Sequence, residues 1–375
     1  MLRRWRRLVV LCCPGLLLLV VLVWSLYYQK GTFPTITFAS PSTRPTTRVL
    51  LLAYYRTGSS FLGEQFNKNS KMFYFFEPLW NYDNAVQKKE GLMYANGTYT
   101  NPPKHGKEYE EHIAIINDLL NCRMHAIPLQ ILTGSRIQTS RNGQQMIESH
   151  SFVTWPGRHR KLENSTYYEC INKNTGFGHG KCVPIIENVC KQSDVTVVKT
   201  IRTRMWQVES LLRENPGLKV VHLLRDPRGQ ILSAKMTLTE GMVFDPDFFA
   251  SNICLMMLRD IHARNKLQEM FPRRILEVQY EDFAEYPYET TTRIYDFLGL
   301  ELPGNLRTNL QRNSRNGGVD TGFMGTSRKD PNATAHAWVL KIDPALAGVV
   351  DEACSELYSE LGLLKYKHLR KRYDF

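Results

Sequence analysis

Two short segments of the chain combine arginine, glycine and hydroxyl residues in a way that suits phosphate or sulfate binding. The first segment, Arg56-Thr57-Gly58-Ser59-Ser60, lies between an apolar run and a helical pattern. Backbone N–H groups at a helix start form an anion cradle, glycine allows close approach, and arginine adds a charge-assisted contact. The Walker pattern G-x-x-x-x-G-K-[ST] is absent from this loop. A tight turn between a strand and a helix is the alternative interpretation.

The second segment begins at Arg225, which ends another apolar run and precedes Asp226-Pro227-Arg228-Gly229. If a helix starts near Pro227, Ser233 lies less than two turns inside it, within reach of the anion that Arg225 would bind. Arginine together with serine suits an isolated phosphate monoester. The alternative is a surface pair of an arginine with the aspartate, beside a helix-starting proline.

A carboxylate, Glu77, follows the aromatic run MFYFF. This position shields the side chain from solvent, and a shielded carboxylate within hydrogen-bond reach of a hydroxyl can act as a general base. A carboxylate that caps the next segment is the alternative. The histidines are scattered, and no C-x-x-C pair follows residue 28, so we expect no metal site.

Apolar runs that alternate with helical patterns predict the elements that position these residues. We expect an α/β fold with a central parallel sheet covered by helices on both sides. The expected strands are residues 48–55, 72–78, 195–199, 218–224 and 275–280, and the later helices are residues 288–298 and 344–361.

The segment 84–193 differs from the rest because it holds two N-x-S/T sequons, four cysteines and the basic run 158–161. We interpret this middle part as an insertion with loops, pinned by disulfides. Its role is either to support the fold or to recognise an acceptor molecule.

The N-terminus predicts a membrane anchor. Residues 8–28 are apolar and uncharged, and four arginines in residues 1–7 precede them. Such a run spans a bilayer, and the positive-inside rule places residues 1–7 in the cytosol. The Pro-, Ser- and Thr-rich residues 29–47 then form a stem, and residues 48–375 form a lumenal domain. A cleaved signal peptide is the alternative.

A lumenal location agrees with sequons at Asn96, Asn164 and Asn332, and with an even number of cysteines after the apolar run. Those six cysteines allow fifteen pairings. The formal net charge of +12 favours acidic partners, among them anionic glycans, nucleic acid, phosphorylated ligands and membrane surfaces.

The segments VLLLAYYRTGSSFLGEQFN, FYFFEPLW and VVHLLRDPRGQILSAKM resemble the Golgi galactose, N-acetylglucosamine and N-acetylgalactosamine 6-O-sulfotransferases. The resemblance continues through VVKTIR, VQYEDFAEYP and TSRKDPNATAHAW, and so covers most of 48–364 in order. Among the subfamilies, the chain is most similar to the keratan sulfate galactose enzyme, with the chondroitin 6-O enzymes close behind.

The resemblance implies a single P-loop-like sulfotransferase domain that uses 3′-phosphoadenosine 5′-phosphosulfate as donor and no metal. The loop Arg56, Thr57, Gly58, Ser59 and Ser60 would hold the 5′-phosphosulfate, and Arg225 with Ser233 would hold the 3′-phosphate. Three further groups would complete the site: Glu77 as the catalytic base, Arg56 and Lys199 beside the leaving group, and Ser327, Arg328 and Arg202 near the donor.

The implied reaction is in-line transfer of a sulfuryl group to the 6-hydroxyl of galactose, N-acetylglucosamine or N-acetylgalactosamine in glycans such as keratan or chondroitin sulfate. The implied location is the Golgi membrane, with a glycan or proteoglycan partner, no nucleic acid, and room for a homodimer. Cys254 with Cys354 is the first disulfide that the resemblance implies. Two alternatives stay open, a catalytically inactive glycan-binding Golgi protein and a nucleotide kinase with a degenerate phosphate loop.

Overall fold

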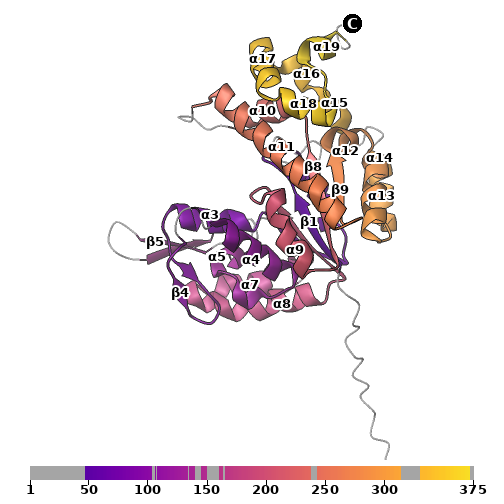
Figure 1. Ribbon diagram of the computed structural model, residues 1–375. Helices are drawn as coiled ribbons and strands as arrows, with labels where there is room; N and C mark the ends of the chain where they lie inside the picture. Colours follow the sequence, from indigo (N-terminus) through magenta and orange to yellow (C-terminus); the bar gives the residue numbers. More distant parts are fainter. Residues whose placement is uncertain are drawn as a thin grey trace, which may run out of the picture. The chain divides into compact units, whose positions relative to one another are not determined.

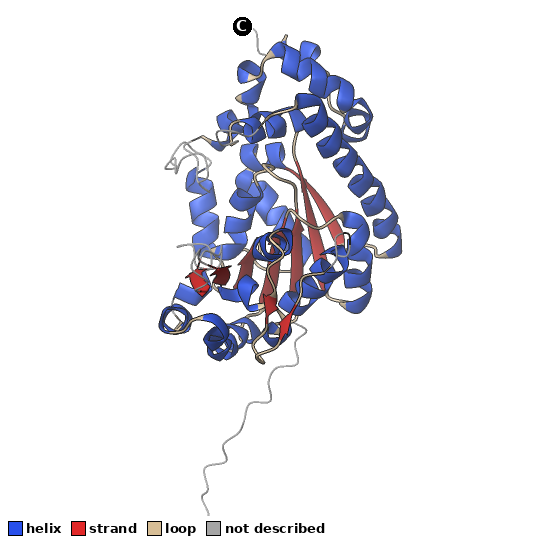
Figure 2. Ribbon diagram, turned by 90° about the vertical axis from the view of Figure 1, so that its left-hand side faces the viewer, coloured by secondary structure: helices blue, strands red, loops and turns tan. Residues whose placement is uncertain are grey.

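The computed structural model describes residues 47–103, 106, 108–133, 135–139, 145–149, 160–163, 165–237, 243–313 and 330–371. Its centre is a five-stranded, entirely parallel sheet (Figures 1 and 2). The strands in spatial order are β2 (Met72–Phe76), β7 (Val195–Thr200), β1 (Thr47–Leu52), β8 (Leu218–Leu224) and β9 (Ile275–Gln279). The bounds of all five strands agree with the predicted runs to within a few residues.

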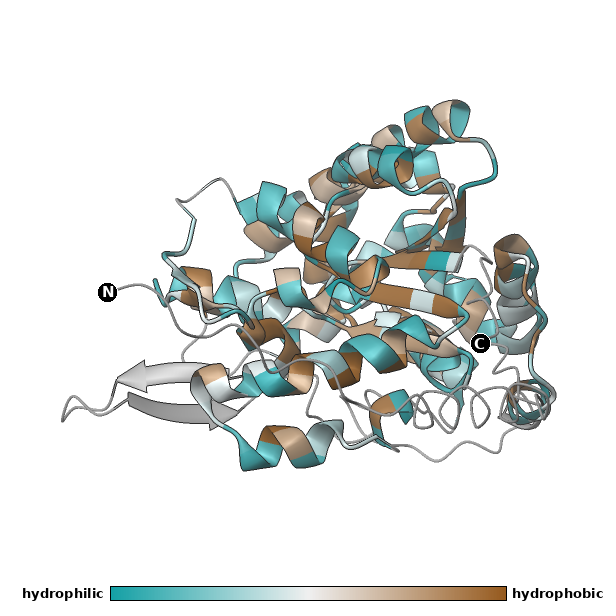
Figure 3. Ribbon diagram, turned by 90° about the horizontal axis from the view of Figure 1, so that it is seen from below, coloured by the Kyte–Doolittle hydropathy of each residue, from teal (hydrophilic) through white to brown (hydrophobic). Residues whose placement is uncertain are grey.

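Alternate side chains of the strands enter two different cores, because successive residues of a strand point to opposite faces. Leu50, with Phe73 and Phe75, belongs to one core, whereas Val49 and Leu51 belong to the other. Burial on both faces explains why each strand reads as a continuous apolar run. Figure 3 shows these hydrophobic strands among helices that alternate apolar and polar residues.

One face of the sheet is covered by helices that lie between residues 79 and 214. These are α3 (Leu79–Gln87), α4 (Glu108–Leu120), α5 (Leu129–Thr133), α7 (Tyr167–Lys173), α8 (Val183–Lys191) and α9 (Val208–Glu214). The other face packs against α2 (Ser59–Asn67), α12 (Tyr280–Glu285), α13 (Pro287–Leu298), α14 (Gly304–Asn313) and α15 (Pro331–His336).

A third core lies beyond the ends of β1 and β8 and contains Tyr54 and Leu224. Its helices are α10 (Pro227–Lys235), α11 (Pro246–Met270), α16 (Trp338–Lys341), α17 (Pro344–Ala353), α18 (Ser355–Leu361) and α19 (Tyr366–Arg370). The remaining elements are α6 (Arg160–Glu163), the pairs β3 (Leu92–Met93) with β4 (Tyr99–Thr100) and β5 (Ser135–Thr139) with β6 (Gln145–Ser149), and the 3₁₀ turns η1 (Met124–Ala126), η2 (Gly176–Cys182) and η3 (Met205–Gln207).

Four of the described helices begin at an Asp-Pro pair. In each, the aspartate side chain accepts a hydrogen bond from a backbone N–H of the first turn, and proline takes the first helical position, where no N–H is needed. The pairs are Asp226-Pro227, Asp245-Pro246, Asp330-Pro331 and Asp343-Pro344. The predicted helix 344–361 is divided into α17 and α18 at Cys354.

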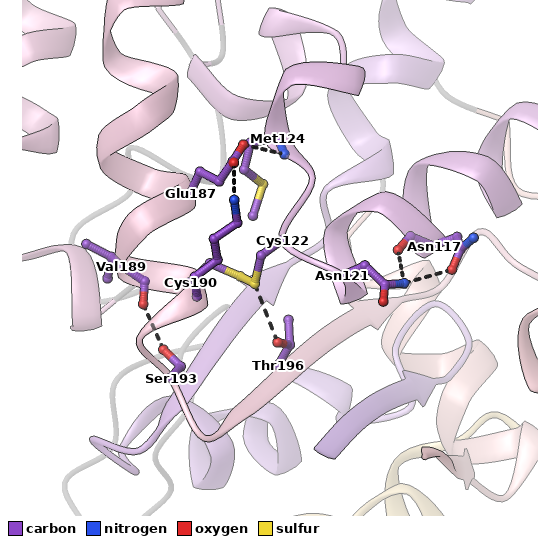
Figure 4. The surroundings of a disulfide bond; sticks show 10 residues. Asn117, Asn121, Cys122, Met124, Glu187, Val189, Cys190, Ser193 and Thr196 are labelled. Carbon is purple, nitrogen blue, oxygen red and sulfur yellow. Dashed lines mark hydrogen bonds and ion pairs between the residues drawn. A yellow bond between two sulfur atoms is a disulfide. The ribbon is translucent and has the colours of Figure 1, made fainter. Parts of the chain in front are cut away.

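The six described cysteines form three disulfides. Cys122–Cys190 and Cys170–Cys182 lie in the middle part, and Cys254–Cys354 joins α11 to the end of α17, as the resemblance implies. In Figure 4, Cys122 also contacts Thr196 of β7, so this disulfide holds α8 to the turn after α4 and against the sheet. The middle part is pinned by disulfides, as predicted, and its described residues also form helices that bury apolar side chains in the first core.

The predicted membrane span 8–28 and all of the stem except Thr47, the first residue of β1, lie outside the described residues, as do Asn164, Ser327 and Arg328. No helix in the part that the structure describes has both the length and the apolar character needed to cross a bilayer.

Candidate functional site

The candidate site lies where the parallel strands end. Arg56 is in the loop after β1, Glu77 directly follows β2, and Lys199 is near the end of β7. Arg225 directly follows β8, and Tyr280 directly follows β9. Ligands of open parallel sheets bind outside the carboxyl ends of the strands, and here every strand delivers a polar or aromatic residue to that edge.

The loop after β1 has the backbone of an anion cradle. Arg56 and Gly58 are both left-handed, with φ of 64° and 78°. A Cβ atom at Gly58 would lie 2.4 Å from ring carbons of Tyr280, so only glycine fits here. Gly58 is also the N-cap of α2, and among the described residues no side chain caps this helix. The first turn of α2, with Ser59 and Ser60, therefore keeps N–H groups for an anion.

Thr57 shapes the loop from within. Its side chain is fully buried, and its hydroxyl donates to the Tyr54 carbonyl over 2.8 Å. The same oxygen accepts from the Tyr54 N–H over 3.3 Å. The hydroxyl is thus engaged by the Tyr54 backbone and fixes the shape of the loop.

The structure joins the two predicted anion-binding motifs. Arg56 Nε donates to Ser233 Oγ over 3.1 Å, and Arg225 Nη1 donates to the Arg56 carbonyl over 2.8 Å. Ser233 lies in α10, within two turns of its start, as the sequence predicts. Asp226 pairs with Arg228 over 2.7 Å, and both side chains are buried, so the pair does not lie on the surface as the alternative requires.

Arg225 is buried, and part of its hydrogen-bonding capacity is unused. Among the described residues, its Nε has no hydrogen-bond partner, and its guanidinium lies 4.4 Å from the centre of the Tyr280 ring. Burial and the neighbouring Asp226 carboxylate raise the pKa of Glu281 to about 7, against the pull of Arg225. The Nε of Arg225 remains a buried donor. This buried donor fits a phosphate group.

Glu77 sits between two cations. Its carboxylate pairs with Lys199 Nζ and with Arg202 Nη1, and Glu77 and Lys199 are 7% and 2% exposed. Lys199 Nζ also lies 4.4 Å from the centre of the Phe76 ring. Glu77 itself is left-handed, with φ of 49°, a conformation that costs energy for a residue with a Cβ. The three residues that the resemblance groups near the reaction are therefore in contact.

A buried hub of Tyr54, His222 and Asp260, which the sequence did not reveal, supports the loop after β1 and the segment after β7. Tyr54 OH lies 2.8 Å from His222 Nε2 and donates to Asp260 Oδ2 over 3.0 Å. Asp260 also accepts from the Met205 N–H over 2.8 Å. Burial lowers the pKa of His222 to about 3 and raises that of Asp260 to about 6. The hub ties the loop after β1 to the segment after β7 through uncharged or hydrogen-bonded groups.

Arg228 is a second residue whose role the sequence did not reveal. It is fully buried, pairs with Asp226 and Asp351, and lies between the rings of Trp338 and Tyr358 at 4.8 and 4.7 Å. It therefore holds the second motif to the C-terminal helices and does not face the anion site.

Other predicted residues lie apart from the site or are already engaged. Asn96 and Asn332 are exposed. Arg160, from the basic run, pairs with the buried Glu64 over 2.8 Å, and Lys161 donates to the Ser70 carbonyl, so both support the fold. No group of three or more His, Cys, Asp or Glu side chains in the described ranges is arranged to hold a metal ion.

Comparison with known proteins gives the following similarities. A model of the sulfotransferase family matches residues 137–304, a range that includes Lys199, Arg225 and Ser233. Carbohydrate sulfotransferase 1 of Danio rerio is 25% identical over 340 residues, which cover 84% of this chain and 77% of that protein. Carbohydrate sulfotransferase 4 of Mus musculus is 24% identical over 373 residues, which cover 92% and 89%.

Solved structures give more distant similarities. Mouse sulfotransferase SULT7A1 complexed with PAP has a TM-score of 0.42 and 8% identity over 88% of both chains. The sulfotransferase domain of the Synechococcus PCC 7002 olefin synthase has a TM-score of 0.41 and 16% identity over 84% of this chain and 94% of that domain.

Proposed function

Because the chain belongs to the carbohydrate sulfotransferase family, we propose that it transfers a sulfuryl group from 3′-phosphoadenosine 5′-phosphosulfate to the 6-hydroxyl of a glycan sugar. The observation that carries this proposal is the direct contact of the two anion-binding motifs, Arg56 with Ser233 and Arg225 with the Arg56 carbonyl. This donor has a 3′-phosphate and a 5′-phosphosulfate, so a single molecule can occupy two adjacent anion sites.

The residues present fit this donor. The uncapped first turn of α2 and the guanidinium of Arg56 would hold the 5′-phosphosulfate, and the donor supplies an activated sulfuryl group when bound. The buried Nε of Arg225 and the Ser233 hydroxyl would hold the 3′-phosphate. Arginine and backbone N–H groups neutralise these anions, so the proposal requires no metal.

Glu77 would accept the proton of the acceptor hydroxyl. At the same time the hydroxyl oxygen would form a bond to sulfur, and the bond between sulfur and the phosphate oxygen would break. Lys199 and Arg202 orient the carboxylate in the present structure. Lys199 and Arg56 would stabilise the negative charge that develops on the leaving phosphate. Sulfuryl transfer resembles phosphoryl transfer in this dependence on positioning and charge stabilisation.

The finer assignments are also proposals. The acceptor would be galactose, N-acetylglucosamine or N-acetylgalactosamine in keratan- or chondroitin-type glycans. Residues 8–28 would anchor the chain as a type II protein of the Golgi membrane, with residues 48–375 in the lumen. Glycosylation at Asn96 and Asn332 agrees with their exposure, and a homodimer is compatible with an anchored, single-domain enzyme.

The test is transfer of radiolabelled sulfuryl by the full chain to a panel of desulfated keratan, chondroitin, N-acetyllactosamine and mucin-type glycans. We expect label on one acceptor class, at carbon 6 of the sugar, with one adenosine 3′,5′-bisphosphate released per transfer. A folded protein that binds the glycans and the bisphosphate without any transfer would instead support the alternative of an inactive glycan-binding protein.

A further inference from the structure

Two exposed aromatic side chains, one on α4 and one in η3, pack against each other. Trp206 is 58% exposed and Tyr109 is 47% exposed. Their ring centres are 6.4 Å apart, and the ring planes meet at 64°. Single exposed apolar side chains are common on protein surfaces and need no explanation, but contacting aromatic rings beside a site provide a surface that a ligand can cover. We call Trp206 and Tyr109 the aromatic pair.

An unbroken series of contacts links the aromatic pair to Glu77. Arg202, which pairs with Glu77, also pairs with Asp83 over 3.0 Å. Asp83 lies 2.6 Å from His112 Nε2, and the His112 ring meets the Tyr109 ring at 90° with centres 6.0 Å apart. The pair is therefore connected to Glu77 through His112, Asp83 and Arg202.

The backbone that carries Trp206 is fixed on both sides. The preceding residue, Met205, is fully buried, and its N–H donates to Asp260. The following residue, Gln207, is also buried; it accepts from the Arg204 N–H over 2.7 Å and donates to the Tyr109 carbonyl over 3.4 Å. The backbone that carries the aromatic pair is thus fixed before a ligand arrives, which lowers the entropy cost of binding.

The charges around the aromatic pair do not favour an anionic ligand. Arg202 already pairs with Glu77 and Asp83, and Arg204 lies 3.9 Å from Asp260. Both arginines that precede Trp206 in the described segment after β7 therefore face carboxylates.

Carboxylates add to this effect. The first turn of α4, which contains Tyr109, also contains Glu108, Glu110 and Glu111. Burial raises the pKa of Tyr82, and the carboxylates of Glu111, Asp83 and Glu108 raise it further. A sulfated sugar or a uronic acid would be repelled at this face, whereas the apolar C–H face of a neutral sugar can lie on an aromatic ring.

We propose that the aromatic pair binds a neutral, unsulfated sugar unit of the acceptor glycan, adjacent to the sugar that receives the sulfuryl group. This inference rests on the proposed function and adds to it a determinant of acceptor length and charge. The chain would then select keratan-type glycans, in which an unsulfated neighbouring unit is neutral, over chondroitin-type glycans, in which that unit is a uronic acid.

The test compares Trp206→Ala with the full wild-type chain in transfer to a desulfated tetrasaccharide and to a single-sugar glycoside of the class that wild type sulfates. Loss of the stacked ring should raise the KM for the tetrasaccharide about tenfold, since part of one aromatic side chain no longer buries sugar surface. The fold-rise should be smaller for the single sugar, kcat should fall much less than KM rises, and the KM ratio should be the same at low and high salt. Trp206→Phe should restore most of the affinity.

Phe177→Ala serves as the matched control, because Phe177 is 46% exposed and lies in η2, inside the loop that Cys170–Cys182 closes. Binding of adenosine 3′,5′-bisphosphate checks that each variant is folded. If wild type transfers label but Trp206→Ala has the wild-type KM for the tetrasaccharide, or if its KM rises equally for both acceptors, the aromatic pair is not a sugar site. If wild type transfers label to no acceptor, the proposed function itself fails.

Discussion

Removal of the Glu77 carboxylate should destabilise the folded protein, whatever its effect on catalysis. Glu77→Ala leaves the ammonium of Lys199, which is 2% exposed, without its carboxylate. Loss of one partner of a buried ion pair costs about 3–5 kcal/mol. At about 2 °C per kcal/mol for a domain of this size, Tm should fall by about 6–10 °C.

A double-mutant cycle separates this cost from lost packing. Glu77→Ala, Lys199→Met and the double variant are each unfolded in urea, and the coupling free energy is read from the four stabilities. We expect a coupling of about 3 kcal/mol, because the double variant contains no isolated buried charge. A coupling near zero would refute the conclusion that the two charges depend on each other inside the fold.

The catalytic arm uses Glu77→Gln, which keeps the shape of the side chain and removes its basicity. If Glu77 is the base, kcat falls by about 10²–10⁴-fold. Binding of adenosine 3′,5′-bisphosphate should stay close to wild type, which shows that the donor site is intact. A kcat near the wild-type value would remove Glu77 from the reaction and leave it a structural ion-pair partner.

Three further predictions concern the loop, the hub and a disulfide. Gly58→Ala should abolish bisphosphate binding in calorimetry, because its Cβ would collide with Tyr280; wild-type affinity would contradict the cradle. Burial lowers the pKa of His222 to about 3 in the folded chain. Between about pH 6.5 and pH 3, His222 therefore binds a proton in the unfolded chain but not in the folded chain. Wild type should therefore lose about 2 kcal/mol relative to His222→Gln between pH 7.5 and pH 5 in urea unfolding, and a constant difference would contradict it. Cys254→Ser with Cys354→Ser opens a loop with a sequence separation of 100 and should cost about 4–5 kcal/mol in urea; an unchanged midpoint would show that the bridge adds no stability.

The strands could be predicted because each is buried on both faces and so reads as an uninterrupted apolar run bounded by turn residues. The site residues could be predicted because they directly follow those runs, where a parallel sheet binds ligands. The longest described helix, α11, was not predicted, although Asp245 and Pro246 give the same start signal as Asp226 and Pro227 before α10.

The Tyr54–His222–Asp260 hub could not be predicted, because its members lie on β8, on α11 and just after β1, and only the strand order brings them together. The aromatic pair has the same origin, since α4 and η3 are far apart in sequence. Local patterns reveal which side chains are buried on an element, but contacts between distant elements depend on how the sheet is ordered and covered.

The central claim is that the two arginine motifs form one donor site that serves sulfuryl transfer. The most direct measurement is transfer of label from radiolabelled 3′-phosphoadenosine 5′-phosphosulfate to a desulfated glycan by wild type and by Arg225→Ala, with bisphosphate binding measured on both. The account predicts transfer by wild type, and loss of both transfer and binding in a folded Arg225→Ala. Full transfer and binding by the variant, or neither activity in a folded wild type, would contradict it.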